Sequence, residues 1–103
     1  MIYTLTTWIL QPGKVDTMNE LLKNVPSLWE KAGGKFVGAW RTTTGNMYEV
    51  TTMLAFENME QRDKSMAALS QNKGFLALSA KREAILIGAT SKLMSPLPMS
   101  PLK

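Results

Sequence analysis

The chain lacks two residue types on which most catalytic and metal-binding sites depend: none of its 103 residues is a histidine or a cysteine. Histidine is the usual general base at neutral pH and the commonest metal ligand. Cysteine supplies the reactive thiolate and the soft metal ligand. Ser–His and Cys–His nucleophiles, ordinary zinc sites and histidine-ligated haem are therefore excluded, and we expect no cofactor and no bound metal.

Long apolar segments and concentrated charge are also missing. No apolar run approaches the roughly 18–20 residues that span a bilayer, and the N-terminus lacks the pattern of a secretory signal. The net charge is +4, but the 12 lysines and arginines are scattered along the chain. They form no basic cluster of the kind that binds nucleic acid. We therefore expect a cytoplasmic protein with no nucleic-acid partner and no membrane partner.

What the chain does have is a clear succession of strand-like and helix-like patterns. Threonine, aromatic and branched residues predict strands, and apolar residues three or four apart predict amphipathic helices. A first helix is predicted at residues 15–32, with a kink at Pro26 and a stop at Gly33-Gly34. A second begins at Asn58 and ends at residues 72–74, and one helical turn follows at residues 75–80. The predicted strands cover residues 2–10, 35–43, 48–56 and 84–94.

The order strand, helix, strand, strand, helix, strand predicts a ferredoxin-like α+β fold, βαββαβ. Its four-stranded sheet is antiparallel, and both helices lie on one face of the sheet. The first strand is apolar on both faces, with Leu5 and Ile9 on one and Trp8 and Leu10 on the other. A sheet with one face in water should alternate more cleanly. We therefore expect a homodimer in which a second copy covers the helix-free face.

The C-terminal segment differs from the rest of the chain. We divide the chain into a ferredoxin-like domain at residues 1–94 and an extended proline-rich arm at residues 95–103. Its three prolines exclude a helix or a central strand. Apolar side chains stand between or beside them: Leu97, Met99 and Leu102. A disordered tail is one reading, and docking of the arm on the protein's own surface or on a partner is the other.

An ordered set of short motifs resembles the NIPSNAP family, within the dimeric α/β-barrel superfamily. The likeness covers nearly the whole chain, and its most specific piece is the closing proline-rich segment. The matching segments are Pro12-Gly13-Lys14, Lys31-Ala32-Gly33, Phe36-Val37-Gly38-Ala39-Trp40, Gly45, Glu57 with Gln61-Arg62, and Pro96 to Leu102. The resemblance implies a dimeric ferredoxin-like protein. The superfamily includes cofactor-free oxygenases, isomerases, lyases and haem-degrading enzymes, so the fold does not give the function.

The chain departs from this family pattern at polar, site-like positions. The family usually has asparagine where Tyr48 stands, histidine at Thr52 and tryptophan at Leu54. On the first strand it often has glutamate at Thr4 and arginine at Thr6. The resemblance therefore implies that this chain has lost most of the polar groups that its relatives carry there.

Four residues are candidates for lining a ligand pocket: Trp8, Trp40, Tyr48 and Thr52. Tyr48 and Thr52 share one face of the third predicted strand, and Trp40 is the second-strand aromatic nearest the same hairpin. The plainer interpretation of the tryptophans is core packing, since the side chain is large and apolar. An unactivated tyrosine is also a poor general acid at neutral pH.

Three functions remain open at this point. The first is a dimeric small-molecule-binding protein with an apolar pocket between the sheet and the helices, for a small, mainly apolar ligand. The second is a cofactor-independent enzyme of the oxygenase or isomerase type. The third is a structural or interaction module. Turnover without added cofactor separates the second from the first, so the sequence leaves open whether the protein is an enzyme.

Overall fold

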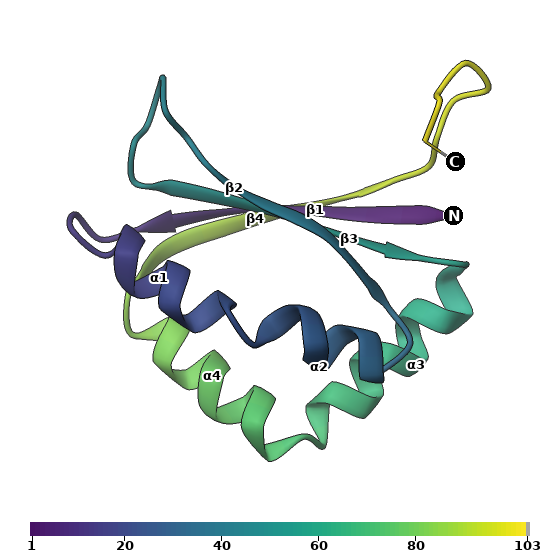
Figure 1. Ribbon diagram of the computed structural model, residues 1–103, viewed down its shortest axis with the longest axis horizontal. Coiled ribbons are helices and arrows are strands. Elements are labelled where there is room, and N and C mark those ends of the chain that lie inside the picture. Colours follow the sequence, from purple (N-terminus) through teal and green to yellow (C-terminus); the bar gives the residue numbers. More distant parts are fainter. Residues whose placement is uncertain (103) are drawn as a thin grey trace.

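The computed structural model describes residues 1–102, and Lys103, the last residue of the predicted arm, lies outside them. The chain folds into one sheet with helices on one side (Figure 1). Its elements run in the order β1 (Ile2–Leu10), α1 (Val15–Leu22), α2 (Val25–Lys31), β2 (Lys35–Arg41), β3 (Glu49–Phe56), α3 (Met59–Ser70), α4 (Lys73–Glu83) and β4 (Leu86–Met94).

The sheet has the predicted ferredoxin-like topology. Its strand order is β2-β3-β1-β4 and each neighbouring pair is antiparallel, so β1 and β3 occupy the centre. The described helices cover one face and leave the other free of helices (Figure 1). The four predicted strands are confirmed, with their ends displaced by two residues or fewer. Strand β1 suits a central position because its threonines and branched residues pack well on a pleated surface.

The segment predicted as one kinked helix is two helices, because Pro26 interrupts the helix one turn before its own position. A proline lacks the N–H that would bond the carbonyl four residues back, and its ring clashes with that carbonyl. For Pro26 this carbonyl belongs to Leu22, where α1 ends. The chain starts a new helix at Val25, with Pro26 in the first turn of α2. The predicted kink at Pro26 is therefore wrong, and the break lies at residues 23–24.

The stop predicted after the first helical segment is confirmed. Gly33 has a φ of 100°, a left-handed conformation that favours glycine. Its N–H donates to the Glu30 carbonyl at 3.1 Å, and the Gly34 N–H donates to the Trp29 carbonyl at 2.9 Å. These two bonds form a Schellman motif. A side chain at Gly33 would also collide with the amide of Gln61, so glycine lets α3 approach the end of α2.

The second helical region is longer than predicted. Asn58 caps α3 as expected, since its Oδ1 accepts a hydrogen bond from the Gln61 N–H at 2.8 Å. Residues 72–74, predicted to end a helix, instead begin α4, because Asn72 Oδ1 accepts from the Phe75 N–H at 2.9 Å. The single turn predicted at residues 75–80 is a helix of 11 residues. Helix α4 lacks a regular apolar stripe, so periodicity could not reveal its length.

A register shift between β2 and β3 decides which way the second strand presents its side chains. Phe36 pairs with Leu54, but after the shift Trp40 pairs with Thr51. Leu54 lies on the helix-facing side of the sheet, whereas the neighbouring odd-numbered Thr51 lies on the other side. Because a shift of one residue moves every later side chain to the opposite face, Phe36 and Trp40 point to different sides.

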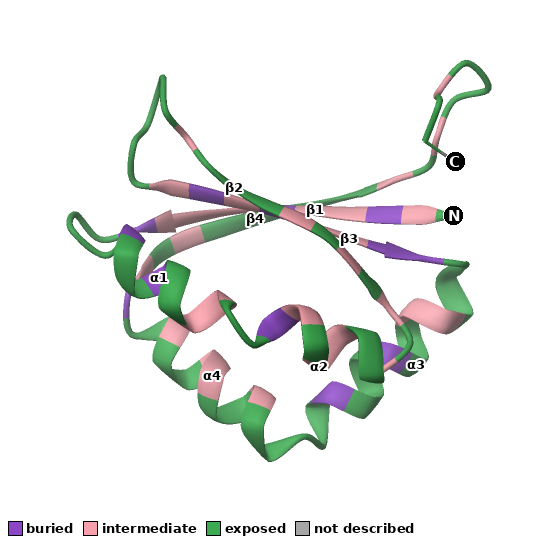
Figure 2. Cartoon of the chain, in the orientation of Figure 1, coloured by how far each residue is buried: buried purple, intermediate pink, exposed green. Residues whose placement is uncertain are grey.

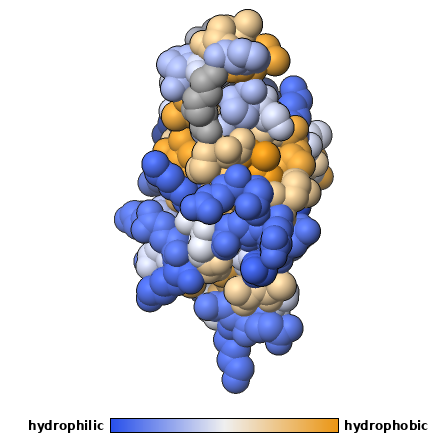
Figure 3. Space-filling model, turned by 90° about the vertical axis from the view of Figure 1, so that its right-hand side faces the viewer, coloured by the Kyte–Doolittle hydropathy of each residue, from blue (hydrophilic) through white to orange (hydrophobic). Residues whose placement is uncertain are grey.

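Residues 95–102 form no helix or strand and extend from the end of β4 on the helix-free side of the sheet (Figure 1). Seen from that end of the molecule, hydrophobic surface lies directly below the arm at the level of the sheet, and hydrophilic surface covers the helices (Figure 3). The arm leaves its apolar side chains more than half exposed: Leu97, Met99 and Leu102. Docking of these side chains on a partner stays a prediction.

Candidate functional site

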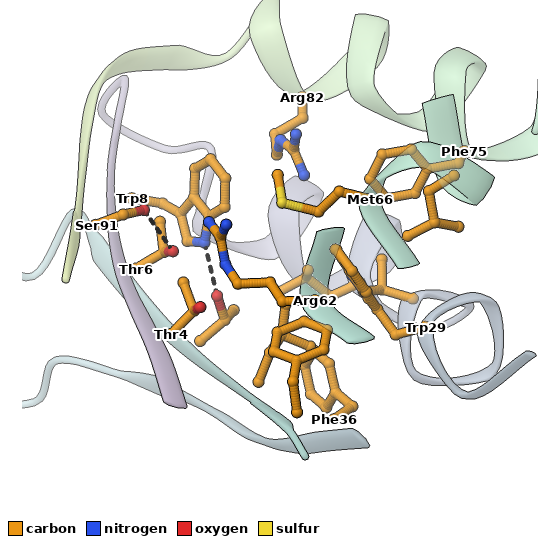
Figure 4. Close-up of a pocket in the computed structure, with 16 residues that line it drawn as sticks. Thr4, Thr6, Trp8, Trp29, Phe36, Arg62, Met66, Phe75, Arg82 and Ser91 are labelled. Atoms are coloured by element: carbon orange, nitrogen blue, oxygen red, sulfur yellow. Dashed lines mark hydrogen bonds between the residues drawn. The ribbon is translucent and has the colours of Figure 1, made fainter. Parts of the chain in front are cut away.

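A cavity of about 300 Å³ lies between the helix-facing side of the sheet and the helices. Figure 4 shows the 16 residues that line it, which come from the strands on one side and from the helices on the other. Most of them are apolar or aromatic. The polar ones are Thr4, Thr6, Thr52, Ser91, Arg62 and Arg82. We call this cavity the Arg–Trp pocket, after the two arginines and the two tryptophans, Trp8 and Trp29, in its wall.

Two packed clusters adjoin the Arg–Trp pocket: an aromatic one that forms part of its wall, and an aliphatic one that meets it through Trp8 and Leu22. Buried residues gather on β1 and β3 and occur on α1, α2 and α3 (Figure 2). One cluster is aliphatic and consists of Leu10, Val15, Met18, Val50 and Ile85. The other is aromatic, with Trp29 in edge-to-face contact with Phe56 at 5.7 Å and with Phe75 at 5.9 Å between ring centroids. Trp8 packs against the aliphatic cluster and also lines the pocket.

The strands give the pocket a floor of hydroxyl groups. Thr6 Oγ1 and Ser91 Oγ share a hydrogen bond of 2.8 Å, and Trp8 Nε1 donates to Thr52 Oγ1 at 3.0 Å. The buried Thr4 Oγ1 has no hydrogen-bond partner among the described residues. A buried polar group without a partner costs ~1–3 kcal/mol, so native proteins seldom keep one without a use.

Arg82, on the last turn of α4, is the most unusual group in the pocket. Its guanidinium carbon lies 4.4 Å from the centroid of the Trp8 ring, which is a cation–π contact. Its Nη2 reaches Ser79 Oγ at only 3.5 Å, and its buried Nε has no partner in the described part of the chain. Burial lowers the pKa of Arg82, and the negative charge of Glu83 opposes this in part. An arginine still stays protonated at neutral pH, so Arg82 is a half-buried cation.

Arg62 brings a second positive charge to the same pocket from α3. Figure 4 shows its side chain reaching into the pocket from the helical side. Its ionic contact is with the neighbouring Asp63, at 3.8 Å between Nη1 and Oδ1, and Asp63 is itself mostly exposed. Exposed pairs of this kind contribute little, typically below about 1 kcal/mol. The described residues that line the pocket include two arginines and no carboxylate.

The structure brings two of the four sequence-predicted pocket residues together and separates the other two. Trp8 and Thr52 both line the Arg–Trp pocket and are hydrogen-bonded to each other. Trp40 is 51% exposed and lies on the helix-free side, because of the register shift in β2. Tyr48 is 43% exposed and precedes β3, so it does not reach the pocket. Ligand contacts for all four residues remain untested predictions.

Sequence reasoning missed both arginines. Arg62 and Arg82 each stand in a polar stretch of helix, where an arginine normally faces water. They come together because α3 and α4 both face the same side of the sheet, which no local pattern encodes. By contrast, four of the five positions where the chain departs from the NIPSNAP pattern line the pocket: Thr4, Thr6, Thr52 and Leu54. The departures were thus the sequence signal that pointed to this place.

Two further features bear on the class of protein. Within residues 1–102, the structure groups no three acidic side chains in a way that could hold a metal ion. None of the helices in that range combines the length and the apolar character that crossing a bilayer requires.

Fold and pocket together define a ferredoxin-like α+β protein with a cavity of small-molecule size between sheet and helices. The chain belongs to the NIPSNAP family, which matches residues 3–101. It resembles a NIPSNAP family protein of unknown function from Agrobacterium tumefaciens, with a TM-score of 0.90 and 23% identity over 100% of this chain and 94% of that one. An uncharacterized NIPSNAP domain protein from Burkholderia xenovorans gives 0.88 and 17%, over 98% and 99%. No curated protein matches the sequence.

Proposed function

We propose that the protein binds a small, mainly apolar molecule in the Arg–Trp pocket, and that it does so as a homodimer. The observation that carries the binding proposal is the cavity of about 300 Å³ between the sheet and the helices, lined mostly by apolar and aromatic side chains. Ligand sites are typically concave, lined mostly by apolar and aromatic groups, and supplied with a few polar groups that fix orientation. With burial of apolar surface as the main source of affinity, a micromolar dissociation constant is the expected order of magnitude.

Binding without turnover is favoured over catalysis by the lining of the pocket. Proton transfer at neutral pH needs a side chain that can give or take a proton there, usually a histidine or a carboxylate. The residues of the described chain that line the pocket include none of these, and their charged members are both arginines. Arginine stabilises negative charge but does not act as a base. Cofactor-independent catalysis therefore stands as the second candidate.

Tryptophan fluorescence tests the binding proposal, because two of the three tryptophans line the pocket. The variant Trp40→Phe removes the indole that lies elsewhere and leaves Trp8 and Trp29 as reporters. Three probes that share an eight-carbon chain are titrated into this variant: octanoate, 1-octanol and octylammonium. A saturable change in emission with at least one probe, accompanied by a rise in melting temperature, is the expected result. If none of the three saturates below millimolar concentration, the pocket does not bind small molecules.

The dimer proposal is supported by the side of the sheet that has no helices. By alternation with the pocket-lining residues of β1, this face carries Leu5 and Ile9, and through its pairing with Leu5 it also carries Met53. Trp40 adds a half-exposed indole. Covering such a surface with a second copy would form an interface of about 1,600 Å², the usual size for a stable complex. Sedimentation at low micromolar concentration should give the mass of a dimer, and a persistent monomer would contradict the proposal.

A further inference from the structure

We propose that the ligand of the Arg–Trp pocket is an amphipathic carboxylate, whose carboxylate binds Arg82 and Arg62 and whose apolar body lies against the aromatic wall. This inference rests on the proposed binding function and specifies the chemistry of its ligand. It follows from the distribution of polar and apolar groups within the one cavity.

The first step concerns unused hydrogen-bond donors. The guanidinium of Arg82 lies over the ring of Trp8, and its one hydrogen bond among the described residues is the long contact of Nη2 with Ser79 Oγ at 3.5 Å. The buried Nε of this group has no acceptor among the described residues, and Thr4 Oγ1 nearby in the same pocket has none either. Buried polar groups are nearly always hydrogen-bonded in native proteins. An acceptor that enters the pocket is the kind of partner that the guanidinium of Arg82 lacks among the described residues.

The second step concerns charge. Two guanidinium groups line a cavity that no carboxylate of the described chain enters, so the pocket is electropositive. Partial burial lowers the pKa of Arg82, and Glu83, whose negative charge opposes this shift, makes no ion pair with it within residues 1–102. Buried charges are normally paired, because an unpaired charge in a poorly solvated site is costly. An anion is therefore the ligand class that the pocket favours, and a cation is the class that it excludes.

The third step concerns size and the form of the head group. At about 30 Å³ for each non-hydrogen atom, as in liquid water, a cavity of this volume holds about ten such atoms. A carboxylate uses three of them and matches the planar fork of a guanidinium with two parallel hydrogen bonds. A phosphate would use five and leave little room for an apolar body. The remaining space adjoins Trp29, Phe56 and Phe75, which suits an alkyl chain or an aromatic ring.

The three eight-carbon probes test this proposal on the unaltered chain, so the result does not depend on whether a variant folds. At pH 7 octanoate should bind at least about tenfold more tightly than 1-octanol, as expected for charge-assisted hydrogen bonds, and octylammonium should bind more weakly than either. Equal affinities of octanoate and 1-octanol would overturn the carboxylate proposal and leave the binding function standing. Failure of all three probes to bind would overturn both.

Substitutions locate the interaction. Arg82→Gln and Arg62→Gln should each weaken octanoate binding by at least about tenfold and change 1-octanol binding by less than about twofold. The matched controls Lys81→Gln and Lys64→Gln remove an equal charge from the same two helices without altering the pocket lining, and should leave both affinities unchanged. Arg82→Lys keeps the charge but loses the planar fork, so an intermediate loss is expected. If the lysine controls weaken octanoate binding as much as the arginine variants do, general surface charge and not the pocket binds the anion.

Discussion

The unpartnered hydroxyl of Thr4 gives a prediction in which one substitution has opposite effects at two neighbouring sites. Thr4 and Thr6 lie two residues apart on the helix-facing side of β1, and both line the pocket. Thr6 shares a hydrogen bond with Ser91, whereas Thr4 Oγ1 is buried without a partner among the described residues. Valine has nearly the shape of threonine and the same branching at Cβ, so each substitution changes little besides the hydroxyl.

The expected magnitudes follow from the state of each hydroxyl. Thr4→Val removes a buried polar group that has no partner, which should raise the free energy of unfolding by about 1 kcal/mol. Thr6→Val removes one hydrogen bond and should lower the free energy of unfolding by about 0.5–1.5 kcal/mol. For a domain of this size, a change of 1 kcal/mol shifts the melting temperature by about 4–8 °C, so the two variants should melt on opposite sides of the parent protein.

Thermal and urea unfolding followed by circular dichroism measure this difference, with every variant at the same protein concentration because association shifts apparent stability. A loss of stability in Thr4→Val equal to that in Thr6→Val would refute the reasoning, since it would mean that the Thr4 hydroxyl is already satisfied. The same variant offers a second readout. If the hydroxyl of Thr4 serves the ligand, Thr4→Val should bind octanoate more weakly although the ligand-free protein is more stable.

Two further predictions concern the helix end at Gly33 and the C-terminal arm. Gly33→Ala should lower the free energy of unfolding by about 1–3 kcal/mol, because alanine is strained in the left-handed backbone conformation and its side chain also meets Gln61. Gly45→Ala is the control: its φ is equally strained, but only Thr42 lies nearby, so it should lower the free energy of unfolding by less in the same urea titration. Removing residues from Ser95 onward should shift the dimer–monomer equilibrium in sedimentation toward the monomer, and an unchanged equilibrium and melting temperature would identify the arm as a passive tail.

The sequence predicted the topology because the strands carry strong local signals. Residues 2–10 are a continuous run of β-forming types, and the pair Gly33-Gly34 directly after an apolar helical pattern is a strong helix-stop signal. The breaks were harder to predict: the effect of Pro26 reaches back to the carbonyl of Leu22, and α4 shows no apolar period. Trp40 could not be placed from the sequence, because a single extra residue near Gly38 reverses the face on which it emerges. The pocket residues that depend on β1 alone, such as Trp8, were within reach.

The arginines were beyond local reasoning for a different reason. Arg62 and Arg82 are separated by 20 positions. Arg62 falls in a segment that matches the NIPSNAP pattern, but the match assigns it no role, and Arg82 lies in no motif at all. Their meeting is a property of the layered arrangement, in which α3 and α4 share one side of the sheet (Figure 1). What the sequence did supply was uncharged threonine at the pocket positions Thr4, Thr6 and Thr52 of β1 and β3, which leaves the helices to provide the charge.

The irregular pairing at the two sides of the sheet has a consequence for how copies of the chain can meet. One register shift lies between β2 and β3 and interrupts β2 after Phe36. The other lies between β1 and β4 at the start of β4, and leaves Gly88 to Met94 regularly paired. A long, regular outer strand is a template on which another chain can add a strand, the first step toward fibrous aggregates. The interruption leaves β2 with only a short stretch of evenly spaced donors and acceptors, from Gly38 to Arg41. Growth by strand addition is thereby discouraged along β2, whereas two copies that met through the broad face of the sheet could associate without polymerising.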